Sequence, residues 1–442
     1  MINRETSETR FTVPFAHGEI AFDLPPGVTG SVATAEPATP LAEPAAAAHR
    51  AVLAPLGSDS LRSLAQGARS VCIAVTDATR ACPDHLLVPP MLAELQAAGV
   101  PAEAITFLVA VGTHRPSTPA ERIEKLGAEI VGRYRVIDHD AANDDNLVAV
   151  MDGPGGVPFR LNRIAVEADL LLATGLVEPH QYAGFSGGGK TVAIGCSDDA
   201  TIAYTHGPAM LDQSGTRLAQ LEGNPFQDAV REVARRSGLA FVGNALLDDH
   251  GAPVAFAYGV PEAVQNHLAE LARPMYTVPI PSQVDIAVAG VGAPKDANLY
   301  QASRAATYLQ FAPTPVVRPG GVVILPATCP EGAGDGAGEQ RFLAAMQHPG
   351  GPAAIVERAR REGIQPGEQR AYIVAAMLQD VQVAIVGVED ADLARSVGFE
   401  PFPTMDAALA WSVDQVRAPA TCLVVPHAVQ TLPVVTSPVA AV

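Results

Sequence analysis

The chain has 442 residues, enough for two or three domains that each bury a core of their own. Apolar residues make up 48% of it and charged residues 17%, a balance typical of a well-packed soluble enzyme. Its formal net charge is −18, and no run of Lys or Arg offsets it, so a nucleic acid would be repelled. No stretch reaches the roughly 18 consecutive apolar residues of a membrane span, and the N-terminus lacks the apolar core of a signal peptide. We therefore expect a cytoplasmic protein without nucleic-acid or membrane partners.

The cysteines do not form a recognisable disulfide or zinc pattern. There are five of them, an odd number, they are scattered along the chain, and no two are arranged as C-x-x-C. We expect them to be small residues of the core: Cys72, Cys82, Cys196, Cys329 and Cys422.

The N-terminal segment predicts a β-hairpin. Residues 11–24 (FTVPFAHGEIAFDL) alternate between apolar and polar, with a turn at Ala16, His17 and Gly18. The next segment, 28–50, is rich in Ala, Pro and Thr and has two interpretations. It could be a disordered linker, or a connector that ends in a short helix near 43–53, and the nearly helical spacing of the apolar residues around this helix favours the second.

Two buried strands are expected to present functional side chains at their carboxyl ends. The segment 70–80 (SVCIAVTDATR) runs into Asp77 and Arg80, and the segment 105–112 (ITFLVAVG) runs into His114. Open α/β sheets bind ligands at the carboxyl ends of their strands, so these residues are candidates for a ligand site. The alternative for Asp77 is that it caps the following helix, a role that Asp84 could also take. A lone histidine such as His114 is more often structural.

The pattern of alternating strands and helices continues to residue 275. Strands are expected at 134–140, 146–150, 168–177, 239–248 and 253–258, with helices at 225–237 and 261–275. His139 lies in the polar stretch DHDAANDDN, for which a solvated loop is the expectation. This alternation predicts an α/β fold with a largely parallel, doubly wound sheet.

The segment 178–206 (EPHQYAGFSGGGKTVAIGCSDDATIAYTH) combines a glycine-rich loop with basic side chains. Its glycines can adopt positive φ and allow the backbone to approach a ligand closely: Gly184, Gly187, Gly188 and Gly189. The residues TVAIG that follow could open a helix whose N–H groups face an anion. His180, Lys190 and His206 add a proton-transfer group, a nucleophilic amine and a metal ligand.

The same loop also satisfies the P-loop pattern of ATP-binding enzymes. Residues 184–191 (GFSGGGKT) match G-x-x-x-x-G-K-[ST]. In a P-loop, however, the first glycine directly follows a strand, whereas here Pro179 and His180 lie between the strand and the loop. A second acidic motif is also weak, because the best candidate ends at Asp390, far along the chain. A P-loop-like ATP-binding enzyme is therefore the alternative function.

A change of composition at 277–282 (TVPIPS) predicts a boundary between two α/β domains, 1–275 and 276–442. The second domain begins with a strand at 285–290, followed by a loop that carries Tyr300, Gln301 and Arg304. The strands GGVVILPATC, VQVAIVGV and ATCLVVP and a helix-rich stretch over 338–380 complete a second sheet.

The motifs, in this order, resemble those of the nickel-pincer nucleotide-dependent lactate racemase family. The resemblance rests on VPFAHGEIAFDLP, EPAAAAHRAVLAPLGSDSL, TDATRACP, GTHRP, EPHQYAGFSGGGK and PKDANLYQASR. It implies two α/β domains, each a mainly parallel sheet flanked by helices, with the active site in the cleft between them. It also implies a cofactor, a pyridinium-3,5-bisthiocarboxylic acid mononucleotide that binds nickel through a ring carbon and two sulfurs. The enzymes that synthesise this cofactor would then be partners of the protein.

The resemblance assigns the cofactor side of the site. His206 matches the fourth nickel ligand, and a flat set of one nitrogen, one carbon and two sulfurs suits square-planar Ni(II). Lys190 matches the lysine that, in lactate racemase itself, binds the cofactor covalently. The rest of the loop would hold the phosphate and one pincer arm: Ser186, Gly187, Gly188 and Gly189.

The resemblance also implies the reaction, which is the inversion of a 2-hydroxy acid through a 2-keto acid. His114 and His180 match the paired acid/base residues, which remove and return the hydroxyl proton while a hydride moves to and from the cofactor. A noncatalytic relative that only binds the cofactor is a third interpretation, and it is disfavoured because both histidines are present.

The remaining matches concern the substrate. Asp77 and Arg80 match an acid and an arginine that line the pocket, where Arg80 could bind a carboxylate or the cofactor. Tyr300 and Gln301 match substrate-side positions of the second domain. Arg304 departs from the family pattern, since lactate racemase has a lysine there. A planar fork favours bidentate carboxylate binding, so the substrate is expected to be a 2-hydroxy acid larger or more acidic than lactate.

Overall fold

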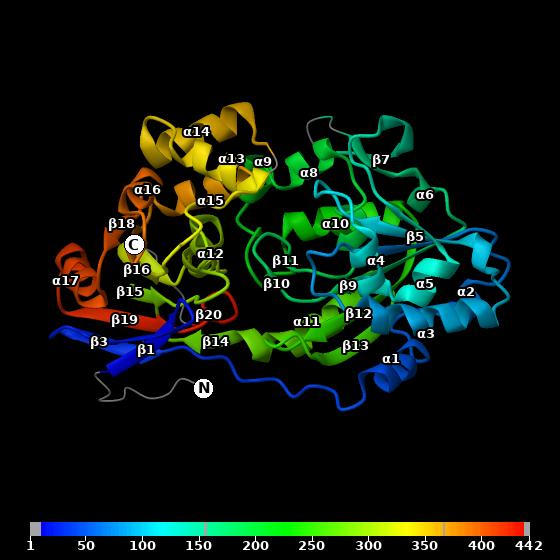
Figure 1. Cartoon of the computed structure of the whole chain (residues 1–442), viewed down its shortest axis with the longest axis horizontal. Helices are drawn as coiled ribbons and strands as arrows, with labels where there is room; N and C mark the ends of the chain where they lie inside the picture. Colours follow the sequence, from blue (N-terminus) through cyan, green and yellow to red (C-terminus); the bar gives the residue numbers. More distant parts are fainter. Residues whose placement is uncertain (1–9, 154–155, 157, 366, 437–442) are drawn as a thin grey trace. The chain divides into compact units, whose positions relative to one another are not determined.

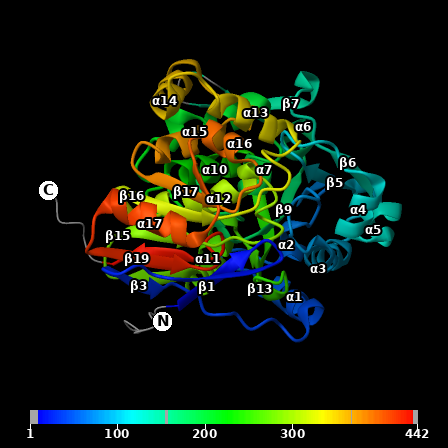
Figure 2. The same ribbon diagram turned by 60° about the vertical axis from the view of Figure 1, so that its left-hand side comes forward.

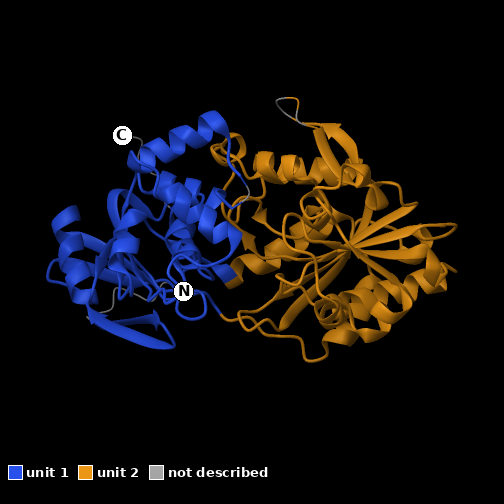
Figure 3. Cartoon of the chain, turned by 45° about the horizontal axis from the view of Figure 1, so that its top comes forward, with its two compact units in different colours: residues 1–36, 276–442 blue, residues 37–275 orange. Residues whose placement is uncertain are grey.

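The computed structural model describes residues 10–153, 156, 158–365 and 367–436. They form two compact units (Figure 3): unit 1 contains the described residues of 1–36 and 276–442, and unit 2 contains the described residues of 37–275. The expected division placed residues 1–36 with the N-terminal domain. The described part of this segment, residues 10–36, belongs instead to unit 1, because a strand at Val28–Val32 completes the sheet of that unit. None of the helices that the structure describes has the length and apolar character required to span a membrane.

Unit 2 is built on a six-stranded sheet with the order β13-β12-β9-β4-β5-β6 (Figure 1). Neighbouring strands are parallel except for β12 and β13, which are antiparallel. The strands are β4 (Val71–Thr76), β5 (Ile105–Ala110), β6 (Arg135–Asp138), β9 (Leu170–Leu176), β12 (Leu239–Leu247) and β13 (Pro253–Gly259). The doubly wound sheet predicted from the sequence is therefore confirmed.

The order of the strands reverses between β4 and β9. From β4 the chain proceeds outward to β5 and β6, and it then returns to β9 on the other side of β4 and proceeds to β12. In doubly wound sheets, ligands bind outside the carboxyl ends of the strands at such a switch point. The segments that follow β4, β5 and β9 are thus the part of unit 2 where a site is expected.

Both faces of this sheet are covered by helices, so its strands carry apolar side chains on both sides. One face carries Ile73, Phe107, Leu172 and Phe241 and packs with α3 in a single core cluster. The helices α7 and α10 contact β9 and β12 with short residues such as Ala173 between them. The helices of unit 2 are α1 (Pro44–Val52), α2 (Leu61–Leu64), α3 (Asp84–Ala97), α4 (Pro119–Leu126), α5 (Ala128–Arg133), α6 (Arg163–Val166), α7 (Lys190–Ala193), α8 (Asp199–Thr205), α9 (Pro208–Leu211), α10 (Pro225–Arg236) and α11 (Pro261–Tyr276), with 3-10 turns at Ala102–Ala104 and Asp144–Asn146.

Two small hairpins complete unit 2. The strands β7 (Leu147–Asp152) and β8 (Pro158–Asn162) pair antiparallel. Beyond the carboxyl end of β9, β10 (Pro179–His180) and β11 (Gly184–Phe185) form a two-residue antiparallel ladder in which His180 pairs with Gly184. The predicted short helix near 43–53 is also present, as α1.

Unit 1 contains a second six-stranded sheet, with the order β18-β17-β16-β15-β19-β3 and all neighbours parallel. Its strands are β3 (Val28–Val32), β15 (Val284–Ala289), β16 (Val317–Pro326), β17 (Gln382–Val386), β18 (Glu400–Phe402) and β19 (Ala420–Val425). The predicted hairpin is present as β1 (Arg10–Phe15) and β2 (Gly18–Asp23), and its Phe11, Val13 and Phe22 join the core under this sheet. A further parallel pair is β14 (Thr277–Ile280) with β20 (Leu432–Val435).

Helices cover the sheet of unit 1. Figure 2 shows α17 (Met405–Val416) beside the strands β15, β16 and β17, which it contacts. The others are α12 (Leu299–Gln310), α13 (Ala337–Met346), α14 (Gly351–Glu362), α15 (Gln369–Met377) and α16 (Ala391–Ser396). The five cysteines of the chain are free and buried in the two units, as predicted for core residues.

Candidate active site

Three strands of unit 2 deliver polar side chains at their carboxyl ends. Asp77 directly follows β4, His114 lies in the loop after β5, and His180 is the second residue of β10, beyond β9. These strands lie side by side around the switch point of the sheet, so the residues after them come from one edge of it.

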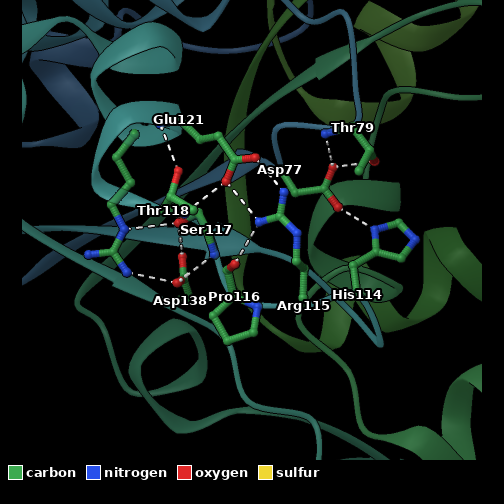
Figure 4. Close-up of polar contacts among 10 residues, drawn as sticks. Asp77, Thr79, His114, Arg115, Pro116, Ser117, Thr118, Glu121 and Asp138 are labelled. Atoms are coloured by element: carbon green, nitrogen blue, oxygen red, sulfur yellow. Dashed lines mark hydrogen bonds and ion pairs between the residues drawn. The ribbon is translucent and has the colours of Figure 1, made fainter. Parts of the chain in front are cut away.

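The closest contact of this edge joins Asp77 to His114 (Figure 4). Asp77 Oδ2 lies 2.5 Å from His114 Nδ1, and Asp77 Oδ1 accepts hydrogen bonds from Thr79 N at 2.9 Å and Thr79 Oγ1 at 2.6 Å. Burial alone would raise the pKa of Asp77, but the hydrogen bonds of His114 and Thr79, with the charges of His114 and Arg80, lower it below its ordinary value. A carboxylate at Nδ1 places the hydrogen of the neutral ring on Nδ1, so Nε2 keeps its lone pair.

His180 has the opposite arrangement. Its Nδ1 accepts hydrogen bonds from the backbone N–H groups of Tyr182, at 3.2 Å, and Ala183, at 3.1 Å. Because Nδ1 is an acceptor here, the hydrogen of the neutral ring lies on Nε2. In their neutral forms His114 therefore offers a base at Nε2, whereas His180 offers a donor.

An aromatic cluster links His180 to His206. The ring of Tyr182 makes edge contacts with both histidines, at 5.5 Å from His180 and 5.7 Å from His206 between centroids. Phe226, a fully buried residue of α10, lies 5.2 Å from His206 and 6.2 Å from His180. These packed rings limit the rotation of both imidazoles.

His206 follows α8 and is held as a neutral ring with one nitrogen available. Its Nδ1 lies 3.1 Å from the carbonyl oxygen of Ile202 and 3.1 Å from Thr205 Oγ1. The carbonyl can only accept, so Nδ1 carries the hydrogen and Nε2 keeps its lone pair. Burial, first, and then the charge of Lys190 lower the pKa of His206 to about 3. A neutral imidazole oriented through its other nitrogen is the usual form of a histidine metal ligand.

Lys190 is the first residue of α7 and lies within electrostatic range of the same groups. Burial and the neighbouring Arg80 lower the pKa of its ammonium group to about 7, against opposing contributions from Glu178 and Asp77. Near neutral pH a large fraction of Lys190 is therefore the free amine, which is the nucleophilic form. The interactions of Lys190 with Asp77, Arg80 and His206 place these predicted residues in one region of unit 2.

The glycine-rich loop is closely packed against the rest of unit 2. A Cβ on Gly189 would lie 2.4 Å from Ala234 Cβ, and one on Gly187 would lie 2.5 Å from Val177 Cγ2. The N–H of Gly188 donates to Asn244 Oδ1 at 2.7 Å, and Ser186 Oγ donates to the carbonyl of Leu176 at 2.6 Å. Internal packing thus accounts for these glycines without a ligand, a structural reason that the sequence did not reveal.

The described residues of this segment do not form a P-loop. The strand β9 ends at Leu176, and the β10–β11 hairpin separates it from the consecutive glycines. The helix α7 that follows is a single turn, Lys190–Ala193, and the N–H groups of Gly188 and Lys190 donate to Asn244 Oδ1 and to the carbonyl of Gly187. The alternative of an ATP-binding enzyme therefore gains no structural support.

Comparison with known proteins identifies the family of the chain. The family model of the lactate racemase N-terminal domain matches residues 15–219 of the sequence. The family model of the lactate racemase C-terminal domain matches residues 279–433. The chain belongs to the lactate racemase family. Members of this family are racemases, so the protein is an isomerase.

Named relatives in the family share about a third of their residues with the chain. Lactate racemase of Lactiplantibacillus plantarum is 32% identical over 360 residues, which cover 80% of this chain and 82% of the relative. Lactate racemase of Thermoanaerobacterium thermosaccharolyticum is 31% identical over 380 residues, covering 85% and 87%.

Solved structures share the fold of the family. The lactate racemase apoprotein from Thermoanaerobacterium thermosaccharolyticum matches with a TM-score of 0.84 and 26% identity, over 96% of this chain and 100% of that one. A crystal structure of a Thermotoga maritima protein matches with a TM-score of 0.63 over 91% and 100% of the two chains. At 18% identity, the latter supports the fold alone.

The donor groups of unit 2 fit the cofactor that the family resemblance implies. No group of three or more His, Cys, Asp or Glu side chains gathers as a metal site in the part of the chain that the structure describes. His206 offers a buried nitrogen that is prepared for a metal, and no cluster of three protein ligands forms around it among the described residues, so a metal bound there would take further donors from a bound molecule. A nickel-pincer nucleotide supplies three donors of its own, and Lys190 offers an amine beside them.

The three predicted substrate-side residues lie in unit 1, on a helix and not in the expected loop. Asn298 caps α12 by accepting a hydrogen bond from Gln301 N at 2.9 Å, which starts the helix before these residues. Arg304 Nη2 donates to Tyr308 Oη at 2.8 Å, and its guanidinium carbon lies 5.4 Å from the centre of the Tyr308 ring. Tyr300 also has an arginine over its ring, because the guanidinium carbon of Arg370 lies 5.6 Å from the centre of the Tyr300 ring.

Two expectations about polar residues of unit 2 are wrong. His139 was expected in a solvated loop, but it is 2% exposed, with Nε2 2.9 Å from the carbonyl of Ser197 and Nδ1 3.1 Å from Asn162 Nδ2. Asp84 does not cap α3, whose N-cap is Pro83. Its fully buried carboxylate accepts hydrogen bonds from Thr76, Thr174 and the Cys82 thiol instead.

Several residues that shape the site were not predicted. Tyr182 and Phe226 pack between the histidines, and Asn224 Nδ2 donates to the carbonyl of Tyr182 at 2.7 Å. Lys125 is buried below the loop that follows β4. The only signal for Tyr182 was its position between His180 and the glycines, and no local pattern marks the other three.

Proposed function

We propose that the protein interconverts the two enantiomers of a 2-hydroxy acid, with a nickel-pincer nucleotide as its cofactor. The observation that carries the proposal is the combination of His206, a neutral imidazole with Nε2 available, and Lys190, an amine with a pKa near 7, in one region where the described residues form no cluster of three or more metal ligands. The membership of the chain in the lactate racemase family supports the same reaction class.

The chain would hold the cofactor through a small number of groups. His206 would bind nickel through Nε2, because Nδ1 is committed to the carbonyl of Ile202. Lys190 would bind a thiocarboxylate arm, and Arg80 would bind an anionic group of the cofactor or the substrate. When bound, the cofactor supplies an electrophilic ring carbon that accepts the α-hydride of the substrate and returns it.

The proton transfers fall to the two histidines. His114, with Asp77 at Nδ1, is arranged to take the hydroxyl proton at Nε2, and the carboxylate stabilises the imidazolium that results. Loss of the hydroxyl proton and the α-hydride would give a 2-keto acid, and its reduction from the opposite face would invert the carbon. His180 would return the proton from the other side. A histidine that transfers a proton carries hydrogens on both nitrogens at one stage, so His180 must release the N–H groups of Tyr182 and Ala183 during the cycle.

The proposed substrate class is based on the cation on α12. Arg304 has a planar guanidinium that contacts Gln301 Oε1 and Tyr308 Oη, at a position where the family resemblance implies a lysine. A fork binds a second carboxylate in bidentate fashion, so we propose malate-like or larger 2-hydroxy acids in preference to lactate. In Arg304→Lys the ratio of kcat/KM for lactate to that for malate should increase.

The test is a chiral assay of protein produced together with the enzymes that synthesise the cofactor. Each enantiomer of lactate, malate and longer or aromatic 2-hydroxy acids is supplied, and formation of the opposite enantiomer is measured. We expect interconversion of at least one pair and nickel bound to the wild type, with the nickel lost in His206→Ala. Magnesium-dependent hydrolysis of ATP by a protein without nickel, or a nickel-loaded protein that inverts none of these acids, would contradict the proposal.

A further inference from the structure

Lys125 is a nearly buried cation to which the reaction assigns no role. It lies in the last turn of α4, its side chain is 13% exposed, and its Nζ lies 2.8 Å from Asp84 Oδ2. Asp84 is itself fully buried, and it also accepts hydrogen bonds from Thr76 Oγ1 and Thr174 Oγ1. A buried ion pair of this kind is stable only when its remaining hydrogen-bonding groups are satisfied.

The ammonium group of Lys125 does more than balance the charge of Asp84. It donates to Thr76 Oγ1 at 2.9 Å and to the backbone carbonyls of Arg80 and Cys82, both at 3.0 Å. These two carbonyls belong to the loop that follows β4 and carries Asp77 and Arg80. Lys125 therefore fixes the backbone of this loop from below, while the N–H of Arg80 donates to the carbonyl of Asp77 at 3.1 Å.

The same helix also holds the loop that carries His114 (Figure 4). Glu121 of α4 binds Arg115, the neighbour of His114, through two hydrogen bonds of 2.9 Å and 2.5 Å. Arg122 donates to Ser117 Oγ at 2.9 Å and to Asp138 Oδ2 at 2.7 Å, and Asp138 also accepts from Ser117. Successive turns of one helix thus contact both loops from which the candidate catalytic groups project.

We propose that Lys125 is a positioning residue, which holds the backbone of Arg80 and Cys82 so that the Arg80 and Asp77 side chains keep their places relative to His114. The relevance of this to catalysis rests on the proposed function, whereas the anchoring of the loop does not. A cation that only neutralised Asp84 would require neither carbonyl contact. Small misplacements of catalytic groups are costly, so loss of this anchor is expected to lower kcat/KM by about tenfold to a hundredfold.

The experiment separates charge balance from anchoring with two variants. Lys125→Met leaves the Asp84 carboxylate buried without its partner and should lower the melting temperature. Lys125→Met/Asp84→Asn removes both charges, so its melting temperature should recover most of the difference. If Lys125 positions the loop, the double variant still shows faster hydrogen exchange over residues 77–83 than the wild type, and its kcat/KM stays low. Arg62→Met is the control. It breaks an ion pair with Glu94, which lies on α3 as Asp84 does, and Arg62 contacts neither the loop after β4 nor the loop after β5.

The outcomes distinguish this inference from the proposed function. A double variant with wild-type exchange over residues 77–83 and wild-type kcat/KM would overturn the positioning role. Hydrogen exchange is measured on the protein without cofactor, so it gives an answer even if the wild type inverts no 2-hydroxy acid. In that case the proposed function fails, and the exchange data alone decide whether Lys125 anchors the loop.

Discussion

Asp77 and His114 form a carboxylate–imidazole pair across the ends of two adjacent strands, with Asp77 Oδ2 2.5 Å from His114 Nδ1. Asp77 is 5% exposed, whereas the side chain of His114 is 43% exposed. The carboxylate is thus fixed within the protein while Nε2 of the ring remains accessible. An imidazole supported in this way is set in one tautomer and gains a partner for its positive charge.

Replacing Asp77 with asparagine should reduce turnover more than binding. The amide oxygen of Asp77→Asn could still accept from Nδ1, but the amide has no charge to stabilise the imidazolium, so kcat is expected to fall by about 10²-fold or more with a smaller change of KM. Steady-state kinetics of the nickel-loaded protein measures both constants. A variant that retains wild-type kcat would show that Asp77 does not support proton transfer.

The Asp77 pair should also make stability depend on pH at the acidic end. Because the pKa of Asp77 is lowered in the folded protein, its contribution is fully present above the ordinary aspartate value of about 3.9 and is lost as the pH falls through the lower folded value. The difference in free energy of unfolding between the wild type and Asp77→Asn, measured in urea from pH 7 to pH 2, should therefore shrink below pH 4. A difference that stays constant over this range would contradict the assignment.

His180 is predicted to transfer a proton and not only to donate a hydrogen bond. His180→Gln keeps an amide donor with a reach similar to that of Nε2 but cannot accept and release a proton near neutral pH, so it should be as inactive as His180→Ala. Both variants should keep their nickel, which elemental analysis measures. If His180→Gln were active and His180→Ala inactive, the form with a donor at Nε2 would be the functional one, and another group would have to supply the proton.

In the cofactor-free protein, Lys190 should lower the free energy of unfolding at neutral and lower pH. Its pKa is about 7 in the folded protein and ordinarily 10.5, so between these values the unfolded chain binds more protons and the free energy of unfolding rises with pH. Below pH 7 the loss of unfolding free energy caused by Lys190 is fully present. Lys190→Met should accordingly be more stable than the wild type at pH 6, with the difference closing toward pH 10. Urea titrations of the two proteins across this range provide the measurement, and equal stability at pH 6 would rule out the lowered pKa.

The close packing of the glycine loop predicts a cost for a single methyl group. Gly189→Ala would bring a Cβ to 2.4 Å from Ala234 Cβ and is expected to destabilise the protein by about 1–3 kcal/mol. Gly132→Ala is the matched control, because nothing lies within 4 Å of its Cβ position on α5, and alanine there should stabilise by about 0.5–1 kcal/mol. Gly189→Ala/Ala234→Gly should recover part of the loss. Denaturant unfolding measures all three, and a neutral Gly189→Ala would show that the loop can move away.

The sheets of both units could be predicted because their strands are apolar runs that stand out locally. β4, β5 and β9 are buried along nearly their whole length, and each ends in a polar or glycine-rich segment. The pairing of β3 could not be predicted, because its partner is β19, at the other end of the chain. Local alternation identifies a strand but does not identify its neighbour.

The polar residues also fall into two groups, those whose surroundings could be predicted from the sequence and those whose surroundings could not. The positions of Asp77 and His114 after two parallel strands were sufficient to expect them at one edge, and the structure brings them into contact. The roles of His180, Lys190 and His206 stay predictions. His139 and Asp84 were misjudged from their neighbours in sequence, because their partners, Ser197 and Thr174, are distant along the chain.

The placement of unit 2 inside the sequence of unit 1 sets an order for folding during synthesis. Unit 2 can leave the ribosome in full long before β19 is synthesised, so it can form its sheet while β3 still lacks a partner. The parallel pairing of Val28 with Ala420 closes nearly the entire chain into one loop, which makes it a late and slow step. A released chain truncated near residue 275 should accordingly contain a protease-resistant unit 2 joined to an unprotected hairpin.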